Sequence, residues 1–256
     1  MPTGGLLFSD YFLKSGVEDL PEWADQAAGD LAAARETIEQ IISSAADAAS
    51  MNESETERLV VEPLLDLLGW SSRLTQQNLS PFGRSDVPDF LLFADTRSME
   101  QARLEPAQNR RYRYGRSFLE AKPWQVALDR ASGGSAPSTQ MLRYLSLAEA
   151  QSDQRIRFGL LTNGRLWRLY DQKARSRAEE FLEIDLLLVA RPIWRQVPMK
   201  QIVLSACSSC SSQSLPSDLI RTERRSTSAP LAKAGDTKSE SQERSVTPFS
   251  AGPSGT

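Results

Sequence analysis

The chain has 256 residues, of which 40% are hydrophobic and 25% charged, a composition typical of a soluble globular domain with one sizeable core. Its 30 Lys and Arg are balanced by 33 Asp and Glu. This excludes a nucleic-acid-coating protein that is basic over its whole surface, but it allows a local basic patch. It has no His and only two Cys, which excludes imidazole catalysis and a four-thiolate zinc site within one chain, so acid–base or metal chemistry must use carboxylates, Lys, Tyr and Ser.

We expect neither a membrane span nor a signal peptide in this sequence. No apolar run approaches the ~20 residues that a membrane span requires. The partly apolar stretch 5–13 is interrupted by Asp10 and follows no basic region, so it makes a poor signal peptide. We therefore expect a cytoplasmic protein without a membrane partner.

The first 68 residues predict helices. Residues 1–50 form a helical lead, in which the Ala-rich stretch 22–50 has apolar side chains at helical spacing. The clearest helix is Asn52–Leu68, where Asn52 is a suitable N-cap and Gly69 a natural stop. Pro63 lacks an amide hydrogen and predicts a kink in this helix.

Short apolar runs then predict a sheet. Val87–Phe93 and Ser117–Lys122 are expected strands, and between them residues 97–116 carry six Arg and two Glu, a local net charge of +4. The further expected elements are a helix at Ser138–Ala150, strands at Phe158–Thr162 and Leu166–Tyr170 joined by an Asn163-Gly164 turn, and a segment at Phe181–Val189 that fits a strand or a helix.

The composition changes near the end of the chain. The last 52 residues hold 14 Ser and one aromatic residue, Phe249, which is too little apolar surface to offset the entropy of ordering. We expect an ordered domain over 51–195 and a Ser-rich, disordered tail over 196–256. Cys207 and Cys210 fall in this tail without further metal ligands, and we interpret their spacing as incidental.

Two carboxylates and one lysine are the candidate metal-binding and catalytic residues. Asp89 begins one predicted strand, and Glu120 and Lys122 share a face of the next, because side chains at i and i+2 point the same way. If the two strands are neighbours, Asp89 and Glu120 can hold one divalent cation, and their oxygen ligands suit Mg²⁺. Lys122 would then offset negative charge, while Gln140 and Tyr144, at i and i+4 on a helix, can orient a DNA backbone or the attacking water.

These residues carry a family resemblance. Pro88-Asp89 followed by Glu120-x-Lys122 resembles the PD-(D/E)xK nuclease signature, and Gln140-x-x-x-Tyr144 resembles an extra motif of the nuclease domain in type I restriction endonuclease subunits. Stretches within Glu53–Trp70 and Leu161–Asp171 are similar to the same group. The opening, Leu7–Trp23, is similar to the start of fused type IIG-like restriction–modification proteins.

The resemblance implies an α/β fold with a restriction-endonuclease-like core, a mixed central sheet flanked by helices. It implies a Mg²⁺-dependent endonuclease of a restriction–modification defence system that cleaves double-stranded DNA, working with methyltransferase and specificity components missing from this chain. The metal ligands implied are Asp89, Glu120 and Ala121, and the catalytic group also includes Lys122, Gln140 and Tyr144. Glu53 corresponds to a helix carboxylate near the metal in some relatives, and Glu57, one turn on, is an equal candidate by geometry.

An Arg cluster is the candidate DNA contact. Its members are Arg110, Arg111, Arg113 and Arg116, which can neutralise phosphates, with Tyr112 and Tyr114 between them as stacking surfaces. A solvated loop is the competing interpretation.

Plainer interpretations stay open for the motif residues as well. Asp89 can cap a turn, Glu120 and Lys122 can face solvent on an edge strand, and Gln140 and Tyr144 can be a helix surface pair. The chain could therefore be a catalytically incomplete DNA-binding or assembly module, or an unrelated α/β domain. Coordinates that place Asp89 and Glu120 far apart would favour the last interpretation.

Overall fold

The computed structural model describes residues 3–16, 19, 28–47, 50–131 and 134–189. All of them belong to one compact unit, Met1–Ile220. The predicted disordered tail at 196–256, with its two cysteines, lies outside the described residues, as does the start of the predicted helix at 22–50.

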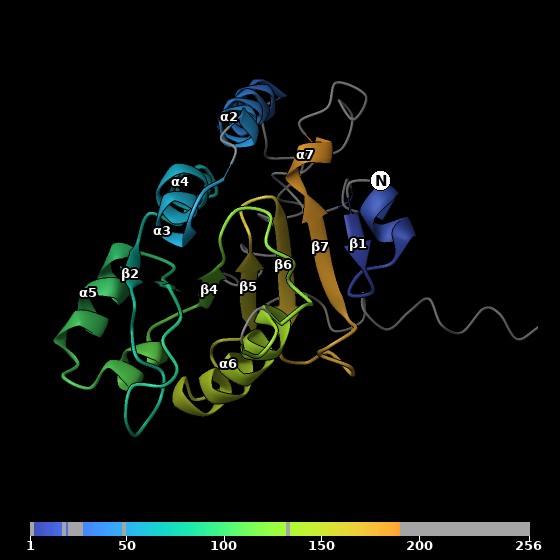
Figure 1. Ribbon diagram of the computed structural model, residues 1–256. Coiled ribbons are helices and arrows are strands. Elements are labelled where there is room, and N and C mark those ends of the chain that lie inside the picture. The colour runs from blue at the N-terminus through green and yellow to red at the C-terminus, as the bar shows by residue number, and fades with distance from the viewer. Residues whose placement is uncertain (1–2, 17–18, 20–27, 48–49, 132–133, 190–256) are drawn as a thin grey trace, which may run out of the picture. The chain divides into compact units, whose positions relative to one another are not determined.

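The described residues form a seven-stranded mixed sheet in the order β1-β7-β6-β5-β4-β3-β2 (Figure 1). β4 and β5 are parallel, and every other neighbouring pair in this sheet is antiparallel. Helices flank the sheet, which confirms the predicted α/β class with a mixed central sheet. The strands are β1 Thr3–Gly5, β2 Arg73–Thr75, β3 Phe90–Leu92, β4 Ser117–Ala121, β5 Phe158–Thr162, β6 Leu166–Asp171 and β7 Phe181–Asp185.

The predicted helix at Asn52–Leu68 is confirmed, with a change of helical type inside it. Asn52 caps it through reciprocal 2.9 Å hydrogen bonds with Glu55, the capping box. This helix consists of three consecutive segments, α3 (Glu53–Thr56), the π-helical segment η2 (Glu57–Val61) and α4 (Glu62–Leu67). The π-helical segment shifts the backbone hydrogen bonds just before Pro63, which accommodates the missing amide hydrogen without ending the helix.

Several elements differ from the expectations. The predicted strand at Val87–Phe93 pairs only over Phe90–Leu92, and Phe181–Val189 divides into β7 and a short helix, α7. The Arg-rich stretch is helical. The remaining helices are η1 Phe12–Gly16, α2 Ala28–Asp47, α5 Thr96–Leu104, η3 Gln108–Arg113, α6 Pro137–Gln151 and α7 Leu186–Val189.

Two apolar cores lie on the two faces of the sheet. Leu119 and Ala121 of β4 belong to the core that includes residues of α2, η2 and α4. Phe118 belongs to the other core, together with Met141 and Leu145 of α6. Because both faces of β4 are covered, all five of its residues are buried, including the polar Ser117 and Glu120, and Glu120 is 3% exposed. This burial excludes the interpretation of Glu120 as a solvent-facing residue.

None of the helices in the described part of the chain has the length and hydropathy that crossing a membrane requires.

Candidate functional site

Asp89 and Glu120 are brought together by strand pairing. In the antiparallel β3–β4 pair, Phe90 lies opposite Leu119, so the preceding residue Asp89 lies beside Glu120. The Asp89 carboxylate Oδ2 accepts a 2.7 Å hydrogen bond from the backbone N–H of Ala121. The sheet therefore holds this carboxylate at the end of β4, beside Glu120, so the separation that would have favoured an unrelated α/β domain is not observed.

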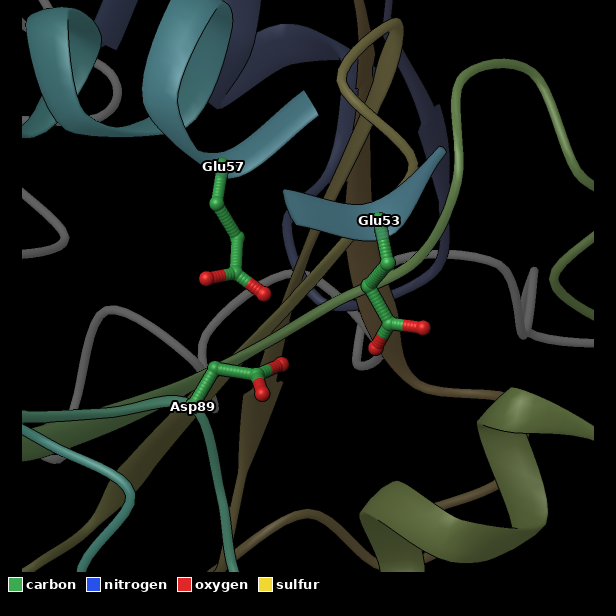
Figure 2. A group of neighbouring side chains, drawn as sticks. All are labelled: Glu53, Glu57 and Asp89. Carbon is green, nitrogen blue, oxygen red and sulfur yellow. The ribbon is translucent and has the colours of Figure 1, made fainter. Parts of the chain in front are cut away.

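A second group of carboxylates comes from the helix above the sheet. Glu53 of α3 and Glu57 of η2 lie one turn apart and point toward Asp89 (Figure 2). One oxygen atom from each of Glu53, Glu57 and Asp89 lies within 4.8 Å of the other two, a separation that one metal ion can bridge. The capping box at Asn52 fixes the start of this helix and with it the position of Glu53.

Lys122 joins these two groups. Its Nζ lies 2.7 Å from Glu120 Oε1 and 3.3 Å from Glu53 Oε1, so the ammonium bridges β4 and α3. The side chains of Glu120 and Lys122 thus lie on the same side of the strand, as the i and i+2 spacing predicts. Burial opposes the charge on Lys122, but the carboxylates of Glu120 and Glu53 more than compensate and raise its pKa above the ordinary value.

The carboxylates are crowded and desolvated. Burial raises the pKa of Glu120 to about 8, with a further contribution from the Asp89 charge. Burial likewise raises the pKa of Asp89 to about 6, against the hydrogen bond from Ala121 and the charge of Lys122. The pKa of Glu57 rises to about 7 through burial and the charges of Asp89 and Glu53. A bound cation would favour the ionised forms of all of these groups.

The donor set suits a hard cation. Glu120 Oε2 is buried, and no group among the described residues donates a hydrogen bond to it, so this oxygen has an unused lone pair beside the other carboxylates. Oxygen-only ligands in partly open surroundings match the preference of Mg²⁺. Ala121, the third ligand that the resemblance implies, is fully buried and could contribute only its backbone carbonyl oxygen.

Gln140 and Tyr144 lie behind Glu120. Gln140 Nε2 donates a 2.7 Å hydrogen bond to the Tyr144 hydroxyl, as expected for residues one helical turn apart. The Tyr144 ring is buried edge-on against Phe118, so the surface-pair interpretation is wrong for this residue. Burial and the nearby Glu120 charge raise the pKa of Tyr144, which keeps its hydroxyl protonated and able to donate.

The Arg cluster is organised differently from the expectation. Tyr112 is fully buried and its hydroxyl donates to the Gln77 carbonyl at 2.8 Å, so it offers no stacking surface. Arg111 donates to the Gln77 side chain at 2.7 Å, which gives it a structural role.

The other three arginines of the cluster have different surroundings. Arg110 and Arg113 are exposed, and Arg113 forms a 3.4 Å ion pair with Asp153. Arg116 precedes β4 by one residue, which puts its backbone about 13 Å from Glu120 at 3.3 Å per residue.

No protein family, curated protein or solved structure matches this chain. The roles of the residues are therefore argued from their arrangement. Sequence reasoning named Glu53 and Glu57 as possible ligands, and one oxygen of each lies within 4.8 Å of an oxygen of Asp89. Their i and i+4 spacing after the capping residue placed both carboxylates on one helix face, but only the tertiary structure brings that face to Asp89.

Proposed function

We propose that this chain is a Mg²⁺-dependent DNA endonuclease domain with a restriction-endonuclease-like core, acting in the cytoplasm in a restriction–modification-type defence system. One observation carries the proposal: Asp89, Glu120 and Lys122 meet at one end of two paired strands, with the ammonium 2.7 Å from the Glu120 carboxylate. Two carboxylates and a lysine in this arrangement are the groups that metal-assisted phosphodiester hydrolysis uses.

The residues that would hold Mg²⁺ are Asp89, Glu120 and the Ala121 carbonyl oxygen, with Glu53 and Glu57 completing the acidic surroundings. When bound, the ion supplies the Lewis acidity that hydrolysis of a phosphodiester requires. Binding needs these carboxylates ionised, so their raised pKa values make the affinity increase with pH.

Lys122 and the hydrogen-bonded pair Gln140 and Tyr144 are the residues that act on the substrate. Held by Glu120 and Glu53, the Lys122 ammonium presents a fixed positive charge where negative charge develops on the phosphoryl oxygens. Gln140 positions the protonated Tyr144 hydroxyl, which can orient the attacking water or a phosphate oxygen. Water attacks phosphorus, the bond to the leaving 3′ oxygen breaks, and that oxygen takes up a proton.

Plasmid cleavage tests the proposal. The purified chain is incubated with supercoiled plasmid in Mg²⁺ or in EDTA, and wild type is compared with Lys122→Ala. Wild type should nick or linearise plasmid only with Mg²⁺, and the variant should be at least about 100-fold slower, as for loss of a preorganised charge stabiliser. The matched control is Lys173→Ala, an exposed lysine of the same chain, which should cleave normally. Equal cleavage by the wild type and the Lys122 variant would contradict the assigned role.

A second candidate follows from the exposed Arg110 and Arg113 on η3. In this case the chain is a catalytically incomplete DNA-binding or assembly module of such a system, and methyltransferase and specificity components are supplied by other chains. A gel shift of plasmid without cleavage in Mg²⁺, identical for wild type and Lys122→Ala, would favour this function.

A further inference from the structure

The segment between β2 and β3 is a hairpin that continues past the sheet. The Gln76 N–H donates to the Asp89 carbonyl at 2.8 Å, and the Leu79 N–H donates to the Asp86 carbonyl at 2.7 Å. The two arms therefore run antiparallel from Asp89, in the candidate site, to a tip at Ser80–Ser85. At 3.3 Å per residue, the arm from Asp89 to Asp86 is about 10 Å long.

The tip is held in place by hydrogen bonds. The Asn78 side-chain amide donates to the carbonyls of Ser80 and Gly83, at 3.2 and 2.7 Å. The Ser80 and Ser85 hydroxyls donate to the buried Asp86 carboxylate at 2.7 and 2.9 Å. The tip is therefore an ordered turn, although its side chains are exposed. Within it, Gly83 adopts a φ of +71°, a conformation that favours glycine.

What the tip exposes is one aromatic ring and one cation. Phe82 is 90% exposed, the highest value among the exposed large hydrophobic side chains of the described residues, and Arg84 beside it is exposed too. The tip sequence Ser-Pro-Phe-Gly-Arg-Ser contains no acidic residue. Arg143 of α6 is 58% exposed and forms a 2.5 Å ion pair with the Asp86 carboxylate, which ties the base of the tip to α6.

The hairpin also rests on the Arg-rich helix η3. The Asn78 N–H donates to the Gln108 side chain at 3.0 Å. Gln77, on the same arm, accepts hydrogen bonds from Arg111 and Tyr112. The arm is thus hydrogen-bonded to the helix that carries the exposed Arg110. A polyanion bound at the tip would therefore meet further positive charge on that helix.

We propose that the tip Pro81–Arg84 is an element that contacts duplex DNA beside the carboxylates, with Phe82 packing against sugar or base edges and Arg84 on a phosphate. This inference rests on the proposed function, because it names the part of the chain that positions that substrate. An exposed aromatic ring can pack against deoxyribose or base edges of a duplex, and an arginine near it can pair with a phosphate. The arm length of about 10 Å is comparable with the major-groove width of about 12 Å, so a duplex at Asp89 lies within reach.

The experiment measures binding separately from cleavage. The full chain is titrated into a fluorescein-labelled 30-base-pair duplex in EDTA, and the anisotropy gives Kd for wild type, Phe82→Ala, Phe82→Trp and Arg84→Ala. Phe82→Ala and Arg84→Ala should each weaken binding about tenfold, whereas Phe82→Trp should bind like wild type because the ring is retained. Arg84→Ala should also reduce the dependence of Kd on salt concentration.

The matched control is Leu104→Ala on α5, an apolar side chain that is 83% exposed and has no part in the hairpin, and it should bind like wild type. Lys122→Ala should lose plasmid cleavage, whereas the tip variants should bind more weakly but still cleave at saturating protein, which separates the two proposals. If wild type binds and both tip variants bind equally well, the tip inference is wrong, whereas Mg²⁺-dependent cleavage that still requires Lys122 leaves the proposed function intact. If wild type neither binds nor cleaves DNA, both proposals are wrong.

Discussion

Raising the pH from 5 to 8 without divalent cations should destabilise the folded chain. The carboxyl groups of Asp89 and Glu120 have pKa values of about 6 and about 8 in the folded protein, because burial opposes their ionisation, together with the charge of Glu53 at Asp89 and of Asp89 at Glu120. In the unfolded chain they ionise near 3.8 and 4.5. The chain has no His, so no histidine titration contributes to the change in the free energy of unfolding between pH 5 and 8.

The sign follows from proton binding. Between the unfolded and the folded pKa values the folded state holds more protons, so the free energy of unfolding falls as the pH rises. One proton held in excess costs about 1.36 kcal/mol per pH unit, which gives about 4 kcal/mol for Glu120 and about 1 kcal/mol for Asp89 between pH 5 and 8. The two groups titrate together, so we expect a total decrease of roughly 3–5 kcal/mol. Glu57 adds to the same trend, but water screens this half-exposed group and reduces its share.

Urea unfolding followed by tryptophan fluorescence at four pH values between 5 and 8, in EDTA, measures this decrease. Glu120→Gln should flatten the profile, and Glu36→Gln, an exposed glutamate on α2, should leave it unchanged. Millimolar Mg²⁺ should restore stability most at pH 8, because the cation binds the ionised carboxylates. An unfolding free energy that is constant or rises between pH 5 and 8 would refute the crowded, desolvated carboxylates on which the candidate site depends.

Three further changes test the packing around the site by thermal and urea unfolding. Gly159→Ala should cost about 1–3 kcal/mol, because a methyl group there would lie 2.9 Å from side-chain atoms of α6 and β4; Gly134→Ala, where the same group meets nothing within 4 Å, should be nearly neutral. Asn52→Ala should cost about 1 kcal/mol through loss of the helix cap and should also weaken Mg²⁺ binding, measured by calorimetry, because the cap positions Glu53. Arg168→Ala should cost about 1–2 kcal/mol through loss of the ion pairs that the buried guanidinium forms with Glu183 on β7 and with Asp129, less than for a fully buried pair because both carboxylates reach solvent. An unchanged midpoint in Gly159→Ala, Asn52→Ala or Arg168→Ala would contradict the contact concerned.

Local patterns were sufficient where local forces decide structure. The helix after Asn52 could be predicted because its cap and its apolar spacing are both contained in one stretch of chain. β4 could be predicted because a strand covered on both faces has consecutive apolar residues, here Phe118 and Leu119. The same reasoning was wrong for Tyr112, expected to be exposed among arginines, because a buried tyrosine with a bonded hydroxyl looks no different in sequence from a surface one.

The sequence by itself determined the α/β class, the chemical types available for catalysis and the proximity of Glu120 to Lys122, which follows from the alternation of side chains along a strand. Only the tertiary structure decided that Asp89 lies beside Glu120, that Glu53 and Glu57 point at Asp89, and that Tyr144 is buried behind them. Strand register and helix placement depend on contacts between residues tens of positions apart, and the free energy of those contacts is not encoded in any short segment.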